Sequence, residues 1–324
     1  MTKHCFNYCP IDWYEDELLS RGVSIAQITA KLGLDGIEHF VYSLKPPPKL
    51  YKELTVGAHL SYWPCWMGFW LQDEKRLARQ FSRDQQYTEL KDLPKYYTGA
   101  TTPQQWLEVI RANIAASLAT EPGYLVWHVS DAGDWEAFTY KFQYQDREVL
   151  ENAAAVFNAV ADVVPEGIPV LFENLWWPGL RLVDAAMVRY FFSLLNRRDV
   201  GIALDTGHLM NTNPYLRNEA EAADYVCRVV EGLGEFAGMI KAVHLSLSLS
   251  GEYQRTFPRR VPQRITGEVL WRQIINIDQH RPFETRAAKR ILDFLSPEYV
   301  NHELVYDSLE DMERKLFKQL SVCF

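Results

Sequence analysis

The sequence predicts an α/β fold, a (β/α)8 TIM barrel in which eight parallel strands alternate with helices and close into a cylinder. Eight short apolar segments alternate with longer segments of helical periodicity, and eight is the number of strands that closes such a barrel. A chain of 324 residues commonly forms one barrel, and no linker or change in composition divides residues 1–324, so we expect a single domain. An open doubly wound sheet is the alternative, but Pro10-Ile-Asp-Trp13 follows the first strand in place of a glycine-rich phosphate-binding turn.

The predicted strands are short and mostly apolar, as expected of strands buried on both faces of a parallel sheet. They are residues 3–9, 34–40, 56–61, 124–130, 168–173, 200–208, 240–246 and 303–307. The stretch 200–208, VGIALDTGH, shows the pattern most clearly, because five small or apolar residues lead into Asp205. Gly207 is expected to let the chain turn sharply, so that Asp205 and His208 project from the same rim.

Segments with helical periodicity separate these strands. Acidic residues suit the start of the first helix and Gly33 ends it, while Thr102 and Pro103 provide the N-cap and first position of the second. We predict helices at residues 15–32, 103–120, 147–164, 181–197, 218–236, 284–295 and 309–320.

Two long insertions interrupt the alternation, after strands three and seven. The first, residues 62–102, is expected to lie over the site and to contain some helix near residues 72–82, since loops of this length are usually functional or carry their own structure. The second, residues 247–283, is more typical of a solvated loop, although its arginines could meet phosphates. The first is rich in aromatic residues (Tyr62, Trp63, Trp66, Phe69, Trp70, Tyr87, Tyr96 and Tyr97), and the second carries Arg255, Arg259, Arg260 and Arg264.

Composition disfavours several classes of protein. The net charge of −8 argues against a broad surface for nucleic acid or an anionic membrane. No apolar run approaches the ~20 residues that span a bilayer, and the first residues do not resemble a secretory signal. Five scattered cysteines suit reduced thiols better than a disulfide framework, so we expect a cytoplasmic protein.

Polar residues gather at the predicted carboxyl ends of the strands, which form the reactive face of a (β/α)8 barrel. Imidazoles and carboxylates without thiolates suit Zn²⁺, Mn²⁺, Fe²⁺ or Co²⁺, and these are more donors than one ion requires. A histidine taken alone is more often a hydrogen-bonded core residue, but unpaired carboxylates at the ends of apolar strands are costly to bury. The sequence therefore predicts a site for two or three divalent ions. Its candidate residues are His59, His128, Glu173, Asp205, His208, His244 and Asp307, with Asp278 and His280 from the loop before helix 284–295.

The order of these residues resembles that of the xylose isomerase-like TIM-barrel superfamily, which includes endonuclease IV and sugar-phosphate isomerases and epimerases. The resemblance covers nearly the whole chain by strand order. Its sharpest pieces are FEN at 172–174, LDTGH at 204–208, VHLS at 243–246 and DQH at 278–280.

The resemblance implies three metal positions. His59, His128 and Glu173 would hold the first. Glu173, Asp205, His244 and a carboxylate from strand eight would hold the second. His208, Asp278 and His280 would hold the third.

Three features depart from the pattern of the superfamily. Its strand-eight carboxylate is usually glutamate, whereas this sequence offers Asp307 at the predicted strand end and Glu303 four residues earlier, and we choose Asp307 with Glu303 in reserve. The spacing from His244 to Asp278 is longer than expected, which puts the third position in question. Asn-Leu-Trp-Trp-Pro follows Glu173 where the DNA-repair members have a glycine-rich loop.

The resemblance implies three alternative activities. The first is an isomerase or epimerase of a sugar or sugar phosphate, in which Glu173 and Asp307 would transfer the proton of a hydroxy-carbonyl substrate and His208 would hold a substrate oxygen. The others are an endonuclease IV-like phosphodiester hydrolase, disfavoured by the acidic balance, and an iron-cluster enzyme that oxidises a peptide in a groove between the insertions. In the first, Trp63, Trp66, Trp176 and Trp177 would form an apolar floor against the sugar.

Overall fold

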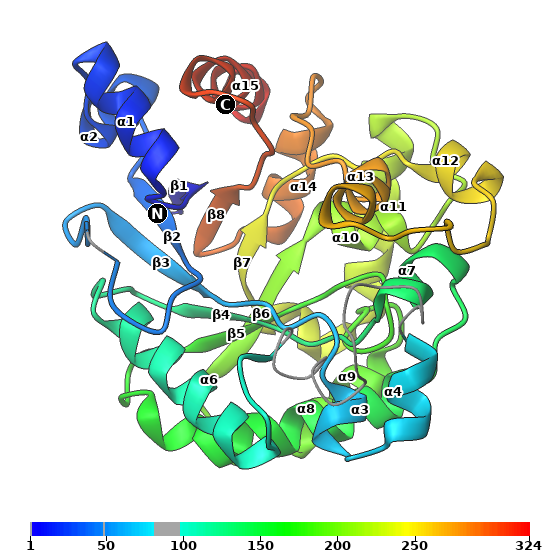
Figure 1. Ribbon diagram of the computed structural model, residues 1–324. Coiled ribbons are helices and arrows are strands. Elements are labelled where there is room, and N and C mark those ends of the chain that lie inside the picture. The colour runs from blue at the N-terminus through cyan, green and yellow to red at the C-terminus, as the bar shows by residue number, and fades with distance from the viewer. Residues whose placement is uncertain (1, 48, 81–97) are drawn as a thin grey trace.

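The computed structural model describes residues 2–47, 49–80 and 98–324, and it shows a closed barrel of eight parallel strands in the order β1 to β8 (Figure 1). The predicted (β/α)8 barrel is therefore confirmed. The strands are β1 Lys3–Tyr8, β2 Gly36–Val41, β3 Thr55–Leu60, β4 Leu125–His128, β5 Val170–Glu173, β6 Val200–Asp205, β7 Ile240–His244 and β8 Tyr299–His302.

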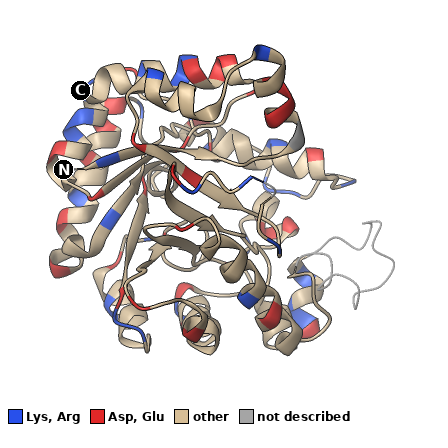
Figure 2. Cartoon of the chain, turned by 90° about the vertical axis from the view of Figure 1, so that its left-hand side faces the viewer, with Lys and Arg blue, Asp and Glu red and all other residues tan. Residues whose placement is uncertain are grey.

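Helices surround the barrel on its outer side, where residues of both signs of charge are interspersed (Figure 2). No helix in the described part of the chain is long and apolar enough to cross a membrane. The helices that connect consecutive strands are α1 Asp12–Arg21, α2 Ile25–Leu32, α6 Pro103–Leu118, α8 Asp146–Val160, α9 Ala185–Ser193, α11 Glu219–Gly232 and α14 Ala287–Leu295, and α15 Leu309–Cys323 follows the last strand.

Two predicted elements differ from the structure at their ends. The single helix expected at 15–32 is two helices, because Gly22 ends α1 in the left-handed conformation (φ 64°) and Ser24 begins α2 with a capping box to Gln27. Strand eight lies earlier than expected, at Tyr299–His302, where it pairs with both β1 and β7. The segment 303–307, whose apolar residues suggested a strand, runs on from β8 without pairing in the sheet.

Both insertions contain helices. The first carries α3 Met67–Trp70 and α4 Glu74–Gln80, while the part of it at 81–97, with Tyr87, Tyr96 and Tyr97, lies outside the described residues. The second carries α12 Gly251–Thr256 and α13 Gly267–Ile277. Two further short helices, α7 Asp134–Thr139 and α10 Thr206–Asn211, directly follow the ends of β4 and β6 and were not expected from the sequence.

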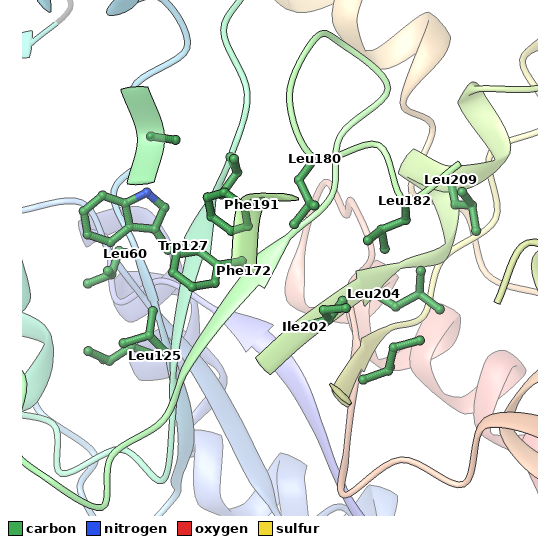
Figure 3. Packing of buried hydrophobic residues seen from close by; sticks show 14 of the residues in the cluster. Leu60, Leu125, Trp127, Phe172, Leu180, Leu182, Phe191, Ile202, Leu204 and Leu209 are labelled. Atoms are coloured by element: carbon green, nitrogen blue, oxygen red, sulfur yellow. The ribbon is translucent and has the colours of Figure 1, made fainter. Parts of the chain in front are cut away.

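The alternation of side chains along each strand separates the core into two parts. In β5, Phe172 points outward and meets Phe157 of α8 and Phe191 of α9 with ring centroids 4.9 Å apart in both pairs. Figure 3 shows Phe172 and Phe191 within this outer core. Leu171 belongs instead to the cluster inside the barrel, so Glu173, two residues later, also faces inward.

A buried polar network fixes the first insertion to the barrel. The Gln80 side chain at the end of α4 donates to Asp131 Oδ2 at 2.8 Å and to Glu136 Oε2 at 2.9 Å. The other Asp131 oxygen accepts hydrogen bonds from the backbone N–H groups of Trp66 and Met67. Burial raises the pKa of Asp131 to about 6 and that of Glu136 to about 7, and Asp131 adds to the second shift.

This network makes stability depend on pH in a defined direction. The pKa of Glu136 is raised on folding from its usual 4.5 to about 7, so the folded state holds the proton more tightly. Its stabilisation is fully present below the unfolded pKa and is lost as the pH rises through the folded pKa. We expect the free energy of unfolding to fall by roughly 2 kcal/mol from about pH 5 to about pH 8. Glu136→Gln should remove a clear part of this slope in urea titrations, and the remainder belongs to other carboxyl groups with raised pKa values such as Asp131.

The exposed Glu310 provides the matched control. Glu310→Gln should keep the wild-type slope. An unchanged slope in Glu136→Gln would show that Glu136 does not carry the effect. The slope is compared rather than the absolute stability, because the Glu136 carboxylate also accepts backbone hydrogen bonds from Gly133 and Gln143 that an amide reproduces only in part.

Candidate metal centre

The structure places three groups of potential metal-binding side chains at the carboxyl ends of the strands, each with its donor atoms within 4.8 Å of one another. Glu173 belongs to the first and second groups, and Asp205 belongs to the second and third. The first group is His59, His128 and Glu173, the second is Glu173, Asp205, His244 and Glu303, and the third is Asp205, His208 and His280.

The first group has the spacing of ligands around one ion. The Nε2 atoms of His59 and His128 are 3.1 Å apart, and Glu173 Oε2 lies 3.1 Å from the first and 2.9 Å from the second. Tetrahedral bonds of about 2.0–2.1 Å place neighbouring donors roughly 3.3 Å apart, so these three atoms fit a common cation. His59 Nδ1 donates to the carbonyl oxygen of Leu60 at 2.8 Å, which leaves Nε2 with its lone pair toward the other two donors.

The second group is supported from inside the barrel. His244 Nδ1 lies 2.6 Å from Glu303 Oε2 and 3.4 Å from Glu173 Oε2. Its other nitrogen, Nε2, lies 3.2 Å from Glu38 Oε2, and Tyr124 and Asn301 hold the Glu38 carboxylate at 2.7 and 2.9 Å. A carboxylate on the far nitrogen of a metal-binding histidine fixes the ring and its tautomer, so Glu38 is a positioning residue for His244. Glu38 thus forms a salt bridge with His244 inside the barrel.

Asp205 provides the clearest sign that the second group suits a cation. Its Oδ2 atom is fully buried and accepts no hydrogen bond from any residue that the structure describes. Burial raises the pKa of Asp205 to about 7, against the opposing effect of His208. An isolated buried carboxylate is costly, and a bound cation would hold it in its charged form. The donors therefore fit a divalent ion.

Asp278 and His280, which the second insertion brings back to the barrel, both lie at the third group, although Asp205 and not Asp278 is its carboxylate member. Asp278 ends α13, and its Oδ2 atom lies 3.1 Å from His208 Nε2 and 2.7 Å from His280 Nε2. Burial opposes ionisation of Asp278, but His208 and His280 hold its pKa below the usual value. Burial would likewise lower the pKa of His280, but Asp278 raises it to about 10. The longer spacing from His244 thus does not keep Asp278 and His280 away from the site.

Glu173 joins the three groups, and four imidazoles surround its carboxylate. His208 Nδ1 lies 3.1 Å from Glu173 Oε1, while His59, His128 and His244 face Oε2. Burial opposes ionisation, but His128 and His244 hold the pKa of Glu173 well below its usual value. Contacts between imidazoles and carboxylates therefore fix the positions of the ligand side chains relative to one another.

Gly207 has a role other than the expected turn. Residues 206–211 form α10, and Asp205 caps this helix by accepting a hydrogen bond from the N–H of His208. A Cβ atom at Gly207 would lie 2.5 Å from the Ser246 hydroxyl oxygen, so glycine is needed for close approach to the segment after β7. His208 still faces Glu173, with its Nδ1 donating to the carbonyl oxygen of Asn174 at 2.8 Å.

Asp307 is the one predicted site residue that the structure places elsewhere. It is exposed, and its N–H donates to Asp311 at the start of α15. The choice of Asp307 over Glu303 was wrong because β8 ends at His302, so Glu303 is the first residue beyond the strand and the one at the mouth of the barrel. The structure brings together the other eight predicted residues, His59, His128, Glu173, Asp205, His208, His244, Asp278 and His280.

A cavity of about 660 Å³ opens above the three groups. Its wall includes two carboxylates and four imidazoles of the site: Asp278, Glu303, His59, His128, His208 and His280. Helix α13 and the loop after β5 contribute apolar side chains. Trp176 and Trp177 line it, as expected, whereas Trp63 and Trp66 pack against Trp106 at centroid distances of 6.1 and 5.5 Å and do not form its floor.

The ligand set can be tested by comparing the two strand-eight candidates. Each purified protein would be stripped with a chelator, reloaded separately with Mn²⁺, Zn²⁺, Fe²⁺ or Co²⁺, and measured by elemental analysis. We expect two or three ions per wild-type chain, and at least one fewer in Glu303→Gln because the second group loses a charged donor. Asp307→Asn should match the wild type. Loss of metal in Asp307→Asn, or none in Glu303→Gln, would contradict the assignment.

No protein-family model matches the chain, and no curated protein matches its sequence. Solved structures do match its fold. Endonuclease IV from Thermus thermophilus has a TM-score of 0.54 at 14% identity, with 99% of this chain and 98% of that chain covered. D-psicose 3-epimerase, solved in the presence of D-fructose, has a TM-score of 0.53 at 13% identity, with both chains covered completely.

A fusion of a xylose isomerase-like TIM barrel with 4-hydroxyphenylpyruvate dioxygenase has a TM-score of 0.53 at 11% identity, over 99% of this chain and 42% of that chain. Identities this low show the fold and leave the reaction open. The structural comparisons thus confirm the resemblance drawn from the sequence, and the chain has the barrel fold of the xylose isomerase-like proteins.

Proposed function

We propose that this protein is a divalent-metal-dependent isomerase or epimerase that moves a proton on a hydroxy-carbonyl substrate. The position of Glu303 carries the proposal. Its carboxylate belongs to the second ligand group, 2.6 Å from His244, and the same residue lines the cavity. A carboxylate at this boundary is within reach of both a bound ion and the substrate held beside it.

The metal supplies one element of this chemistry. When bound, a divalent ion would supply the positive charge that polarises a substrate oxygen and makes the adjacent C–H more acidic. Glu173 and Asp205 are the residues that would be shared between ions, since each belongs to two of the three groups. His208, Asp278 and His280 would hold either a third ion or a substrate oxygen.

The chain's own residues divide the remaining work. Glu303 would accept the proton from carbon, in the role that the sequence alone assigned to Asp307. Glu173 is fully buried beneath the imidazoles and does not line the cavity, so its role is to hold metal and histidines rather than to touch the substrate. The D-psicose 3-epimerase whose fold this chain shares is named for a reaction of the proposed type.

Phosphodiester hydrolysis is the second candidate, and one observation favours it. Three ligand groups are more than a single-ion isomerase requires, and multiple ions suit activation of water and binding of phosphate. The cavity argues against nucleic acid, however, because no lysine or arginine of the described residues lines it. We therefore place proton transfer first.

Exchange of substrate hydrogen with solvent tests the proposal directly. Metal-loaded protein would be incubated in D₂O with D-fructose, dihydroxyacetone or 2-hydroxyacetophenone, and loss of the C–H signal beside the carbonyl followed by NMR. We expect exchange with at least one of these hydroxy-ketones, and a loss of roughly 10²–10⁴-fold in Glu303→Gln because the proton acceptor is removed. Asp307→Asn should exchange at the wild-type rate.

Parallel assays separate the second candidate. Cleavage of bis(4-nitrophenyl) phosphate, or of a DNA duplex with an abasic site, without C–H exchange would contradict the isomerase proposal and support a phosphodiester hydrolase. Exchange that continues unchanged in Glu303→Gln would overturn the role given to Glu303.

A further inference from the structure

The cavity walls beyond the ligand groups are apolar and aromatic, and we propose that the substrate is an uncharged molecule with a compact oxygenated end and a flat apolar body. The oxygenated end rests on the proposed function, because it would meet the metal-binding groups. The apolar body rests on the walls alone. Sugar phosphates, which the resemblance in sequence order brought into consideration, are disfavoured by the same walls.

Aromatic rings stand directly beside the histidines of the site. The ring centroid of Phe40 lies 4.4 Å from that of His59, Tyr62 lies 4.5 Å from His128, and Trp176 lies 5.3 Å from His208. All six residues line the cavity. A molecule whose oxygens reach the donors therefore extends along aromatic faces, which favours a flat apolar group over a hydrated one.

Helix α13 adds an apolar wall. Leu270, Ile274 and Ile275 line the cavity and are half-buried, and Trp271 lines it while remaining 58% exposed. Their spacing along the helix places them on one side of α13, toward the cavity. Half-buried apolar side chains gain from contact with an apolar ligand, since its binding removes more of their surface from water.

A negative charge on the substrate body would find no cationic partner among the described residues of the wall. No lysine or arginine among the described residues lines the cavity. Arg259, from the second insertion, stacks on the rings of Tyr140 at 3.9 Å and Phe257 at 4.2 Å and donates to the carbonyl oxygen of Gln254. It thus packs behind the wall. A phosphate away from the metal-binding groups would lose its hydration without a counter-charge.

The size of the cavity agrees with a body larger than a simple sugar. Its volume of about 660 Å³ would hold roughly twenty water molecules at about 30 Å³ each. Pockets of this size usually enclose ligands larger than a monosaccharide and are mostly apolar. A hexose alone would leave much of the aromatic wall in contact with water.

Binding to metal-free protein tests the apolar body independently of turnover. Chelator-treated protein would be titrated by calorimetry with 2-hydroxyacetophenone, D-fructose and D-fructose 6-phosphate. We expect the aromatic hydroxy-ketone to bind at least about tenfold more tightly than either sugar, because burial of its ring is favourable. Tighter binding of D-fructose 6-phosphate, or equal binding of all three, would overturn the proposal.

Wall variants locate the binding. Trp271→Ala and Ile274→Lys should each weaken 2-hydroxyacetophenone several-fold, while Phe317→Ala, which removes an exposed ring from α15, should leave it unchanged. Lysine is a good helix former and position 274 is only half-buried, so α13 should persist, and circular dichroism would verify it. Unchanged affinity in both wall variants would contradict the assigned site.

The two proposals fail in different ways. Binding of the aromatic probe without metal, but no C–H exchange when metal is restored, would remove the isomerase proposal and leave the substrate class. C–H exchange of D-fructose, with no preference of the metal-free protein for the aromatic probe, would keep the isomerase proposal and remove the substrate class.

Discussion

The fully buried carboxylate of Glu173 is the constraint on which the site depends. A charge at this depth is tolerated only with partners, and four imidazoles face it from the ends of β3, β4 and β7 and from α10. Because these elements are distant in sequence, the barrel must close before the contacts form. A bound cation would offer the Glu173 carboxylate a further opposite charge beside these imidazoles.

Two features of the barrel place partners around Glu173. Alternate side chains of each strand face inward, and a second layer of polar contacts lies beneath the ligand groups. Ala203 and Ala242 fill the interior two residues before Asp205 and His244, so the same face that packs the core presents the donors at its upper end. Beneath them, Glu38 is fully buried and links His244 to Tyr124 and Asn301. The inside of the barrel thus changes from apolar packing to a polar scaffold and then to the ligand groups within a few residues of strand.

The strand order and most of the ligand set could be predicted because they depend on local pattern. Asp205 and His208 follow an apolar strand, and parallel strands carry their ends to one face. Glu303 was placed second to Asp307 because the apolar run at 304–306 predicts a strand that ends at Asp307. The true strand, Tyr299–His302, includes polar Asn301 and His302, which only its neighbours explain. The support from Glu38 depends on tertiary contacts with His244, Tyr124 and Asn301, which a local sequence pattern does not reveal.

The site combines two environments that reinforce each other. The donors carry opposite charges in contact, while rings from Phe40, Tyr62 and Trp176 lie beside the imidazoles in the same cavity wall. Excluding water lowers the local dielectric and strengthens every interaction between the charged groups, including those with a developing charge on substrate oxygen. The same exclusion penalises any charged group that is not placed on the donors. Selectivity for an uncharged, apolar-bodied substrate and stabilisation of charge at its oxygenated end therefore follow from one arrangement of side chains.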